Sequence, residues 1–395
     1  MSGVASPLGF RAAATACGIR PSGPDLALIA ADRGCSAAAV FTANRAQAAP
    51  VVVSREHVAD GTARAVLVNA GCANAGTGEQ GLRDAREMAA LAAEQLGCQP
   101  GEIIVASTGV IGIELPMERI RAGIVRLARS LSRDGGAEAA RAILTTDTHP
   151  KEVVVEFPLD GRTARVGAMA KGAGMIAPRL ATMLAFFTTD AAVSPHLLRQ
   201  SLREAVGASL NRITVDGDTS TNDMAVVLAS GSLPARAILT EGHDLHAFRG
   251  ALGEAAQRIA AMLIRDAEGA TRVAEVRVEG ARSELDADRI ARTVAESPLV
   301  KTAIHGGDPN WGRVLAAVGR ADVELDIGGL DLFLGDVWVA EGGRARAYDE
   351  GLARRAMLED PIRIRVRLHD GQAVGSMWTC DLSGGYVEIN AHYRS

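Results

Sequence analysis

The sequence contains few aromatic residues, few cysteines and no long apolar run. Aromatic residues make up 3% of the 395 positions, so the core has to be built mainly from alanine and aliphatic side chains. The five cysteines are scattered and form no CxxC pair, which argues against a disulfide framework and against a zinc ribbon. No apolar stretch reaches the ~20 residues that a membrane-spanning helix needs.

The charge balance and the N-terminus argue against further classes of protein. A formal net charge of -5 does not fit a nucleic-acid-binding surface, which usually gathers lysine and arginine. Residues 1–7 lack the basic and apolar regions of a secretory signal. Since 48% of the residues are hydrophobic, the chain can fill a large core. We therefore expect a cytoplasmic enzyme that binds neither nucleic acid nor membrane.

Short strands alternate with helices along the chain, which favours an α/β or α+β layered fold. Apolar runs or period-two alternation predict the strands, whereas helical spacing and capping residues predict the helices. Strands are expected at 65–68, 103–106, 152–157, 163–169, 272–278 and 362–368. Helices are expected at 84–96, from Pro116 onward, from Ser194-Pro195 to Gly207, and at 244–265.

The most informative segment runs from Lys171 to Phe187. Between Met169 and Phe187, Thr182 supplies the only hydroxyl, and Lys171 and Arg179 supply the only charges. A buried hydroxyl needs a partner, because leaving it unpaired costs about 1–3 kcal/mol. Thr182 is either an ordinary threonine that bonds to a nearby carbonyl or an N-terminal nucleophile freed by cleavage of the preceding bond. Composition alone does not decide between the two.

Seven motifs follow one another along the chain. One of them spans residues 171–190 and comprises KGAGMIAP, ATML and TTD. The others are STGVIG (107–112), TTDT (145–148), VDGDTSTND (215–223), DAEGAT (266–271), GGDPNWGR (306–313) and YVEINA (386–391). Together they resemble the ornithine acetyltransferases, also called glutamate N-acetyltransferases or the ArgJ family. One such motif is weak evidence, but seven in the family's order favour the nucleophile at Thr182.

The resemblance implies a fold and a processing event. The fold would be an αββα sandwich of the N-terminal-nucleophile type with a smaller C-terminal α/β domain. The chain would cleave itself between Ala181 and Thr182, when the threonine hydroxyl attacks the Ala181 carbonyl and water hydrolyses the resulting ester. Fragments 1–181 and 182–395 would stay together as a heterotetramer of two copies of each. The freed α-amine would act as the base, since its ordinary pKa near ~7.7–8.0 is lowered by burial.

The resemblance also assigns residues to the site. Thr108 and Gly109 would form the oxyanion hole, with a hydroxyl and a backbone N–H as donors. The substrate pocket would contain Thr148, Lys171, Thr182, Glu268, Asn390 and Ser395. Without the resemblance, Thr108-Gly109 is an ordinary strand-to-loop turn and Glu268 an exposed helix end. A buried Lys171 needs an anionic partner or loses its proton, and a substrate carboxylate is the partner that we expect.

The implied activity is acetyl transfer in arginine biosynthesis by a ping-pong route. Thr182 takes the acetyl group from N2-acetylornithine, releases ornithine and passes the group to glutamate. We expect no cofactor and no metal, and acetyl-CoA stays open as a second donor. The alternative is an N-terminal-nucleophile hydrolase, an aminopeptidase or amidase, that uses the same threonine with water as acceptor. A non-catalytic scaffold is disfavoured because Ala181-Thr182, Thr108-Gly109 and Lys171 are all intact.

Two features are expected to be inert. His243 and His246 are spaced for one helix face, but the sequence offers no third metal ligand close to them. Gly172 and Gly174 lack the rest of a GxGxxG turn, so a dinucleotide site is not expected.

Overall fold

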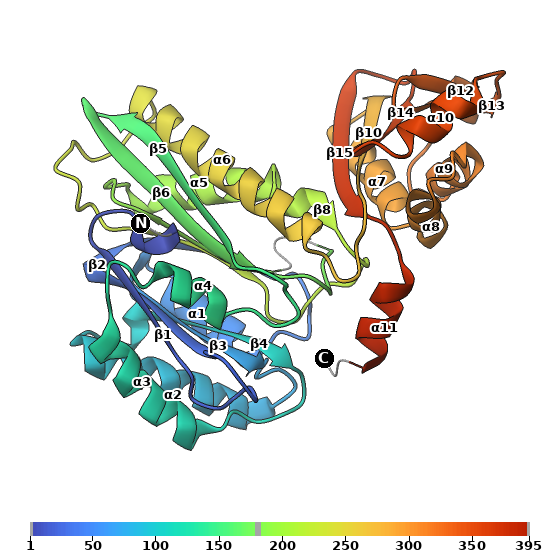
Figure 1. The fold of residues 1–395 in the computed structure, drawn as a ribbon. Helices are drawn as coiled ribbons and strands as arrows, with labels where there is room; N and C mark the ends of the chain where they lie inside the picture. Colours follow the sequence, from blue (N-terminus) through green and yellow to red (C-terminus); the bar gives the residue numbers. More distant parts are fainter. Residues whose placement is uncertain (1–2, 178–182, 393–395) are drawn as a thin grey trace. The chain divides into compact units, whose positions relative to one another are not determined.

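Two sheets organise the chain, one in each of two units (Figure 1). The structure is a computed structural model that describes residues 3–177 and 183–392. Within these residues, unit 1 extends to Asn211 and resumes from Thr219 to Leu263. Unit 2 contains Arg212–Asp218 and the residues from Ile264 onward.

Unit 1 contains an eight-stranded sheet in the order β4-β3-β2-β9-β7-β6-β5, with β1 paired to β2. Its strands are β1 (Phe10–Thr15), β2 (Leu26–Phe41), β3 (Thr62–Cys72), β4 (Ile103–Val110), β5 (Lys151–Leu159), β6 (Arg162–Lys171), β7 (Leu184–Thr189) and β9 (Met224–Ala229). The pairs β3·β4 and β7·β9 are parallel. Every residue of β7 and β9 is buried, as is typical of parallel strands covered on both faces.

Helices cover both sides of these strands. They are α1 (Ala49–His57), α2 (Gly78–Leu96), α3 (Met117–Ser130), α4 (Gly136–Ala142), α5 (Pro195–Gly207) and α6 (His243–Arg265), with short 3₁₀ turns at Gly3–Ala5, Pro100–Glu102 and Leu210–Arg212. In Figure 1, α2 and α3 lie below β1, β3 and β4, and α6 runs alongside β5 and β6. Helix α5 packs on β2 and β9. Phe157 of β5 packs against Phe248 of α6, with ring centroids 5.9 Å apart. This order of layers is the expected αββα arrangement, and the predicted α/β class is confirmed.

Unit 2 contains a seven-stranded sheet in the order β13-β12-β11-β14-β10-β15-β8. The strands are β8 (Ile213–Thr214), β10 (Val273–Ala281), β11 (Asp331–Leu334), β12 (Val337–Glu341), β13 (Arg344–Ala345), β14 (Ile362–Arg367) and β15 (Ala373–Cys380). The helices are α7 (Glu284–Ala295), α8 (Pro298–Gly306), α9 (Trp311–Gly319), α10 (Glu350–Ala356) and α11 (Gly384–His392), with a 3₁₀ turn at Ile327–Gly329. The apolar face of the sheet packs on α7 to α10 and forms a core of its own.

The predicted strands and helices are all present, with differences at their ends. Helix α2 begins at Gly78 rather than near Asp84, and it ends as predicted at Gly97, which takes a left-handed conformation with φ 65°. Ser194 and Pro195 begin α5 as predicted, but the Ser194 side chain makes no capping hydrogen bond. Strand β14 alternates between buried and more exposed residues, in agreement with its period-two pattern.

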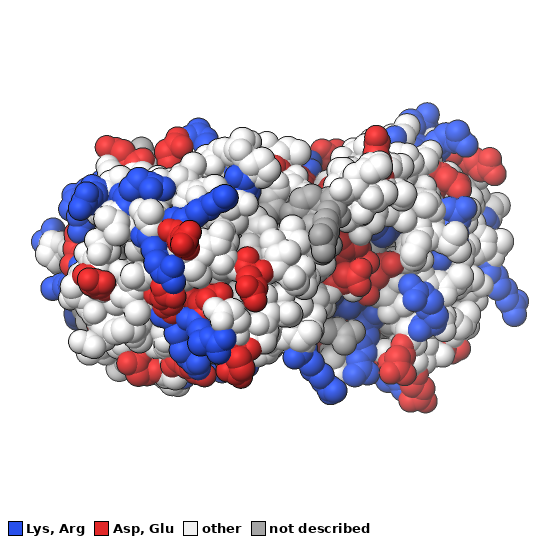
Figure 2. All heavy atoms as spheres, turned by 90° about the horizontal axis from the view of Figure 1, so that it is seen from below, with Lys and Arg blue, Asp and Glu red and all other residues white. Residues whose placement is uncertain are grey.

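The structure also shows the state of the cysteines, the length and polarity of the helices, and the distribution of charge on one face. All five cysteines are free thiols. In the described ranges no helix is both long and apolar enough to cross a membrane. On the face shown in Figure 2, acidic and basic side chains are interspersed, so that face carries no extended patch of one sign.

Candidate active site

The predicted site residues fall into three groups. Thr108, Gly109, Thr148 and Lys171 belong to unit 1, and Glu268 and Asn390 belong to unit 2. Ala181, Thr182 and Ser395 lie outside the described residues.

Thr108 and Gly109 lie at the carboxyl end of β4, beside the end of β3. Gly109 has a φ of 130°, and a Cβ there would lie 2.3 Å from the carbonyl carbon of Gly71. Only glycine fits this close approach of two strands. The half-buried Thr108 side chain and the Gly109 backbone are therefore held at one fixed place at the end of the sheet.

Lys171 is the last residue of β6, and it is buried with 8% of its surface exposed. Its Nζ donates hydrogen bonds to Thr145 Oγ1 at 2.7 Å and to Thr108 Oγ1 at 3.3 Å. Two of the predicted site residues, Thr108 and Lys171, thus meet across the sheet. Thr145 belongs to the TTDT motif, but no feature of the sequence singles it out.

Lys171 has an anionic partner within the chain, Asp147, whereas the sequence led us to expect a substrate carboxylate. Asp147 Oδ2 lies 3.8 Å from Lys171 Nζ, and Oδ1 accepts bonds from Lys151 Nζ at 2.7 Å and from the Gly172 amide at 2.6 Å. Burial alone would raise the pKa of Asp147. The charges of Lys171 and Lys151, with the Gly172 amide, outweigh burial and lower that pKa to about 2. The carboxylate is therefore ionised throughout the physiological range.

Thr148 follows Asp147 directly but is exposed. Its hydroxyl lies 2.9 Å from Nδ1 of His149. Thr148 is thus close in the sequence to Lys151, and it is exposed to solvent.

The motif at 215–223 supplies two further residues that the sequence did not single out. Asn222 Nδ2 donates to the carbonyl oxygens of Ala73 at 2.6 Å and Ser107 at 2.8 Å, so it ties the ends of β3 and β4 together. Asp223 is 3% exposed, and its Oδ2 has no hydrogen-bond partner in the described parts of the chain. Burial raises the pKa of Asp223 well above its ordinary value, so this acid is largely protonated where most carboxylates are charged.

In unit 2, Glu268 and Asn390 are brought together although 122 positions separate them. Asn390, on α11, donates from Nδ2 to Glu268 Oε2 at 2.8 Å and to the Tyr386 carbonyl at 3.0 Å. Gly269 allows this approach, since a Cβ there would lie 2.3 Å from the Tyr386 nitrogen. Glu268 is 8% exposed, so the expectation of an exposed helix end without the family resemblance does not hold.

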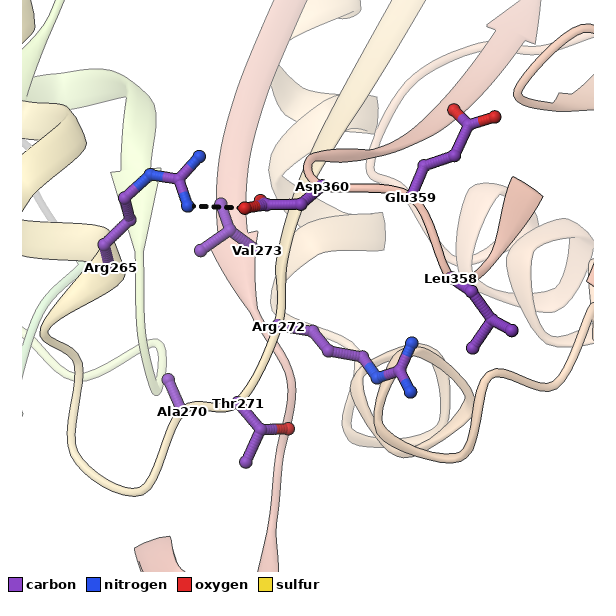
Figure 3. A pocket seen from close by; sticks show the side chains of 8 residues that line it. All are labelled: Arg265, Ala270, Thr271, Arg272, Val273, Leu358, Glu359 and Asp360. Atoms are coloured by element: carbon purple, nitrogen blue, oxygen red, sulfur yellow. Dashed lines mark hydrogen bonds and ion pairs between the residues drawn. The ribbon is translucent and has the colours of Figure 1, made fainter. Parts of the chain in front are cut away.

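A separate hollow of about 420 Å³ lies in unit 2 (Figure 3). It is lined by Arg265, Ala270, Thr271, Arg272, Val273, Leu358, Glu359 and Asp360. Arg265 is paired with Asp360 at 2.9 Å, and Arg272 donates to the Met357 carbonyl at 3.0 Å. None of the predicted site residues that the structure describes lines this hollow.

The two histidines near the start of α6 contact nearby groups on the same stretch of chain. His246 Nδ1 lies 2.8 Å from the Gly242 carbonyl oxygen, and His243 Nδ1 lies 3.7 Å from Asp244. Across residues 3–177 and 183–392, no three His, Cys, Asp or Glu residues gather as a metal site would require.

Comparison with known proteins identifies the family. Residues 11–395 match the model of the ArgJ family. The chain belongs to the ArgJ family. It is 49% identical to the arginine biosynthesis bifunctional protein ArgJ of Symbiobacterium thermophilum, over 100% of this chain and 98% of the relative. It is 46% identical to the protein of the same name from Dehalococcoides mccartyi, over 99% of this chain and 97% of the relative.

A solved ArgJ structure agrees with this assignment. The crystal structure of the arginine biosynthesis bifunctional protein ArgJ from Bacillus halodurans matches with a TM-score of 0.52 and 41% identity. The match covers 54% of this chain and 100% of that crystal chain.

Proposed function

We propose that this ArgJ protein transfers an acetyl group from N2-acetylornithine to glutamate through an acetyl ester on Thr182. Membership of the ArgJ family makes the chain an acyltransferase of arginine biosynthesis. The observation that carries this conclusion is identity of 49% over the full length of a bifunctional ArgJ protein. It favours transfer over the hydrolase alternative, in which water would be the acceptor.

Thr182 becomes the nucleophile in this proposal when the chain cleaves itself after Ala181. Its Oγ attacks the Ala181 carbonyl, water hydrolyses the ester, and the freed α-amine then serves as base for the same hydroxyl. The second fragment, 182–395, makes up 54% of the 395 residues. The crystallised ArgJ chain from Bacillus halodurans is matched in full by 54% of this chain, as expected if that chain is a processed fragment.

Thr108 and Gly109 stabilise the negative charge that develops on the acetyl oxygen. The strand ends fix both groups before substrate binds, and donors fixed in advance are the ones that lower the barrier most. Lys171 adds a buried positive charge within hydrogen-bond distance of the Thr108 hydroxyl, at 3.3 Å.

The substrate pocket is proposed to use acidic and basic side chains for the two ends of an amino acid. Glu268, held by Asn390 at 2.8 Å, binds an amine, and Lys171 attracts a carboxylate. Thr148 and Ser395 provide hydroxyls for the substrate. Amino-acid substrates carry both charges, so this set fits ornithine and glutamate.

Acetyl-CoA is a second acetyl donor in this proposal, because the relatives are named bifunctional. No metal or bound cofactor is required, since the hydroxyl and α-amine of one threonine supply both nucleophile and base. The fragments form a heterotetramer of two copies of each, and the enzyme works in the cytoplasm.

The proposal is tested by giving the purified enzyme glutamate with either N2-acetylornithine or acetyl-CoA. We expect N-acetylglutamate from both donors, and parallel double-reciprocal lines with N2-acetylornithine. Free acetate formed as fast as N-acetylglutamate would instead make water the acceptor and support the hydrolase. A product with N2-acetylornithine alone would restrict the enzyme to a single donor.

A further inference from the structure

We propose that Asp147 is a positioning residue of the oxyanion site, which acts by holding Lys171 against the Thr108 hydroxyl. This inference rests on the proposed function, because it gives Asp147 a part in the same reaction. Asp147 does not touch the substrate in this scheme. It fixes the direction in which Thr108 donates its proton.

The direction follows from the chemistry of the groups. A lysine ammonium can only donate hydrogen bonds, so Thr108 Oγ1 must be the acceptor in its 3.3 Å contact with Lys171. A threonine hydroxyl has one proton to donate. Because Lys171 occupies an acceptor position of that oxygen, the proton is kept for another partner, and an oxyanion next to Gly109 is such a partner. Thr145 Oγ1 accepts a second bond from Lys171 at 2.7 Å and fixes the ammonium further.

The charges of the cluster support the same role. The side chains of Asp147 and Lys151 are 0% exposed, whereas that of Lys171 is 11% exposed. Two ammonium groups and one carboxylate leave one net positive charge, and Lys171 carries it toward the surface beside Thr108. In a poorly solvated place a fixed positive charge stabilises a developing oxyanion more than it would in water.

Other groups do not replace Asp147. Lys151 comes from β5 and donates a second bond to the His149 carbonyl at 3.3 Å, so it is tied to the same loop. Asp223, at the start of β9, is a further acid whose charge would interact with Lys171, but burial favours its neutral form. Asp147 is also bonded to the Gly172 amide at 2.6 Å, so the carboxylate is fixed to the end of the strand that carries Lys171.

The test compares Asp147→Asn with the wild type in two backgrounds. Asparagine keeps the shape and the acceptor oxygen and removes the charge. We expect kcat for acetyl transfer to fall on the order of 10²-fold, the usual cost of misplacing a group at a reacting centre, with KM within about twofold. In a Lys171→Met background the same change should cost less than about twofold, because Asp147 acts through Lys171.

The split between kcat and KM, read beside a structural control, separates positioning from a merely structural role. Loss of the Asp147 charge should lower kcat and leave KM within about twofold, because Asp147 acts on the oxyanion site and not on the bound substrate. Asp25→Asn is the control, because Asp25 is also a buried carboxylate and accepts amides from Cys17 at 2.7 Å and Ile19 at 2.6 Å. It should lower stability and leave kcat per cleaved chain within about twofold of the wild type.

Rates are expressed per cleaved chain, so that a defect in processing is not counted as a defect in turnover. If the wild type transfers acetyl and Asp147→Asn equals it within twofold, the inference is wrong and the proposed function stands. Equal losses in the wild-type and Lys171→Met backgrounds would also overturn it. If the wild type itself transfers no acetyl group, the proposed function fails first. Should Asp147→Asn not fold, Asp147→Glu keeps the charge with altered reach. Its kcat should fall in the wild-type background and not in the Lys171→Met background; an equal fall in both would count against the inference.

Discussion

Single residues in the site differ in charge state because they differ in their neighbours, not in their burial. Asp147 and Asp223 are both buried carboxyl groups, yet their pKa values move in opposite directions. Two lysines and an amide surround Asp147, so it keeps its charge. Burial raises the pKa of Asp223, one oxygen of which has no partner in the described chain. The two acids of one site therefore titrate in shifted ranges on opposite sides of the ordinary value.

The contribution of the oxyanion hydroxyl is measured by Thr108→Ala. Removal of one such donor typically lowers kcat by about 10²–10³-fold, so we expect a loss of that size in acetyl transfer with the fold intact. Thr108→Ser keeps the hydroxyl and should retain most of the activity. A kcat of Thr108→Ala within about twofold of the wild type would place the oxyanion hole elsewhere.

The protonated state of Asp223 predicts a pH effect on stability. Its pKa is raised in the folded chain, so above the ordinary value near ~3.9 the unfolded chain loses a proton that the folded chain keeps. The folded state is therefore penalised increasingly as pH rises. Asp223→Asn should raise the melting temperature at pH 8, and the gain should shrink toward pH 5.

The pKa of Asp147 is shifted in the direction opposite to that of Asp223, so Asp147→Asn is the control for the Asp223 prediction. Its pKa is lowered in the folded chain to about 2, so its stabilisation is present above the ordinary pKa and is lost as pH falls toward 2. Asp147→Asn should lower the melting temperature at pH 8.

For Asp223→Asn, the contradicting result is a lower melting temperature than that of the wild type at pH 8. That result would show that the Asp223 carboxylate is charged and paired.

At the scale of elements, the sequence predicted the strands and helices well and their partners poorly. The apolar runs at 65–68 and 103–106 became β3 and β4, and the helix that ends at Gly97 was correct at that end. Periodicity describes which face of an element is buried. It does not report which element lies alongside, so it could not predict the contact of Lys171 with Thr108, 63 positions away.

The family resemblance assigned the reacting residues but not the residues that hold them. Asp147 is in the quoted TTDT motif and pairs with Lys151 at 2.7 Å. The two residues lie outside any helix, so their spacing of four in the sequence did not predict the pair. Asp223 closes another quoted motif. Its burial follows from the pairing of β7 with β9, where the Met224 amide donates to the Met183 carbonyl at 3.0 Å.

The approach of β3 and β4 gives an element-scale prediction. Gly109→Ala adds a Cβ that would lie 2.3 Å from the Gly71 carbonyl carbon, so the strand ends must separate. Gly112→Ala is the matched control, because Gly112 also has a positive φ, of 81°, but a Cβ there meets nothing within 4 Å. The control should cost about 1–2 kcal/mol of strain, and Gly109→Ala should cost more and lose activity. Denaturant unfolding and acetyl transfer measure both effects; equal losses of stability would mean that the approach is not tight.

At the scale of the whole molecule, the proposed cleavage divides one sheet between two fragments. Strands β7 and β9 belong to fragment 182–395, and they lie between β2 and β6 of fragment 1–181. Backbone pairing therefore joins the fragments on both sides, through β2·β9 and β6·β7. We expect them to elute together in native buffer and to separate only in denaturant. Separation in native buffer would contradict this arrangement.

The central claim is that Thr182 is freed by cleavage and then carries the acetyl group. Intact mass measurement of the purified enzyme, before and after addition of N2-acetylornithine without glutamate, tests both parts at once. We predict two fragments, 1–181 and 182–395, and a gain of roughly 42 Da on the second fragment, located at its first residue and lost when glutamate is added. A single uncleaved chain that is nevertheless active, or an acetyl group on any other residue, would contradict the account.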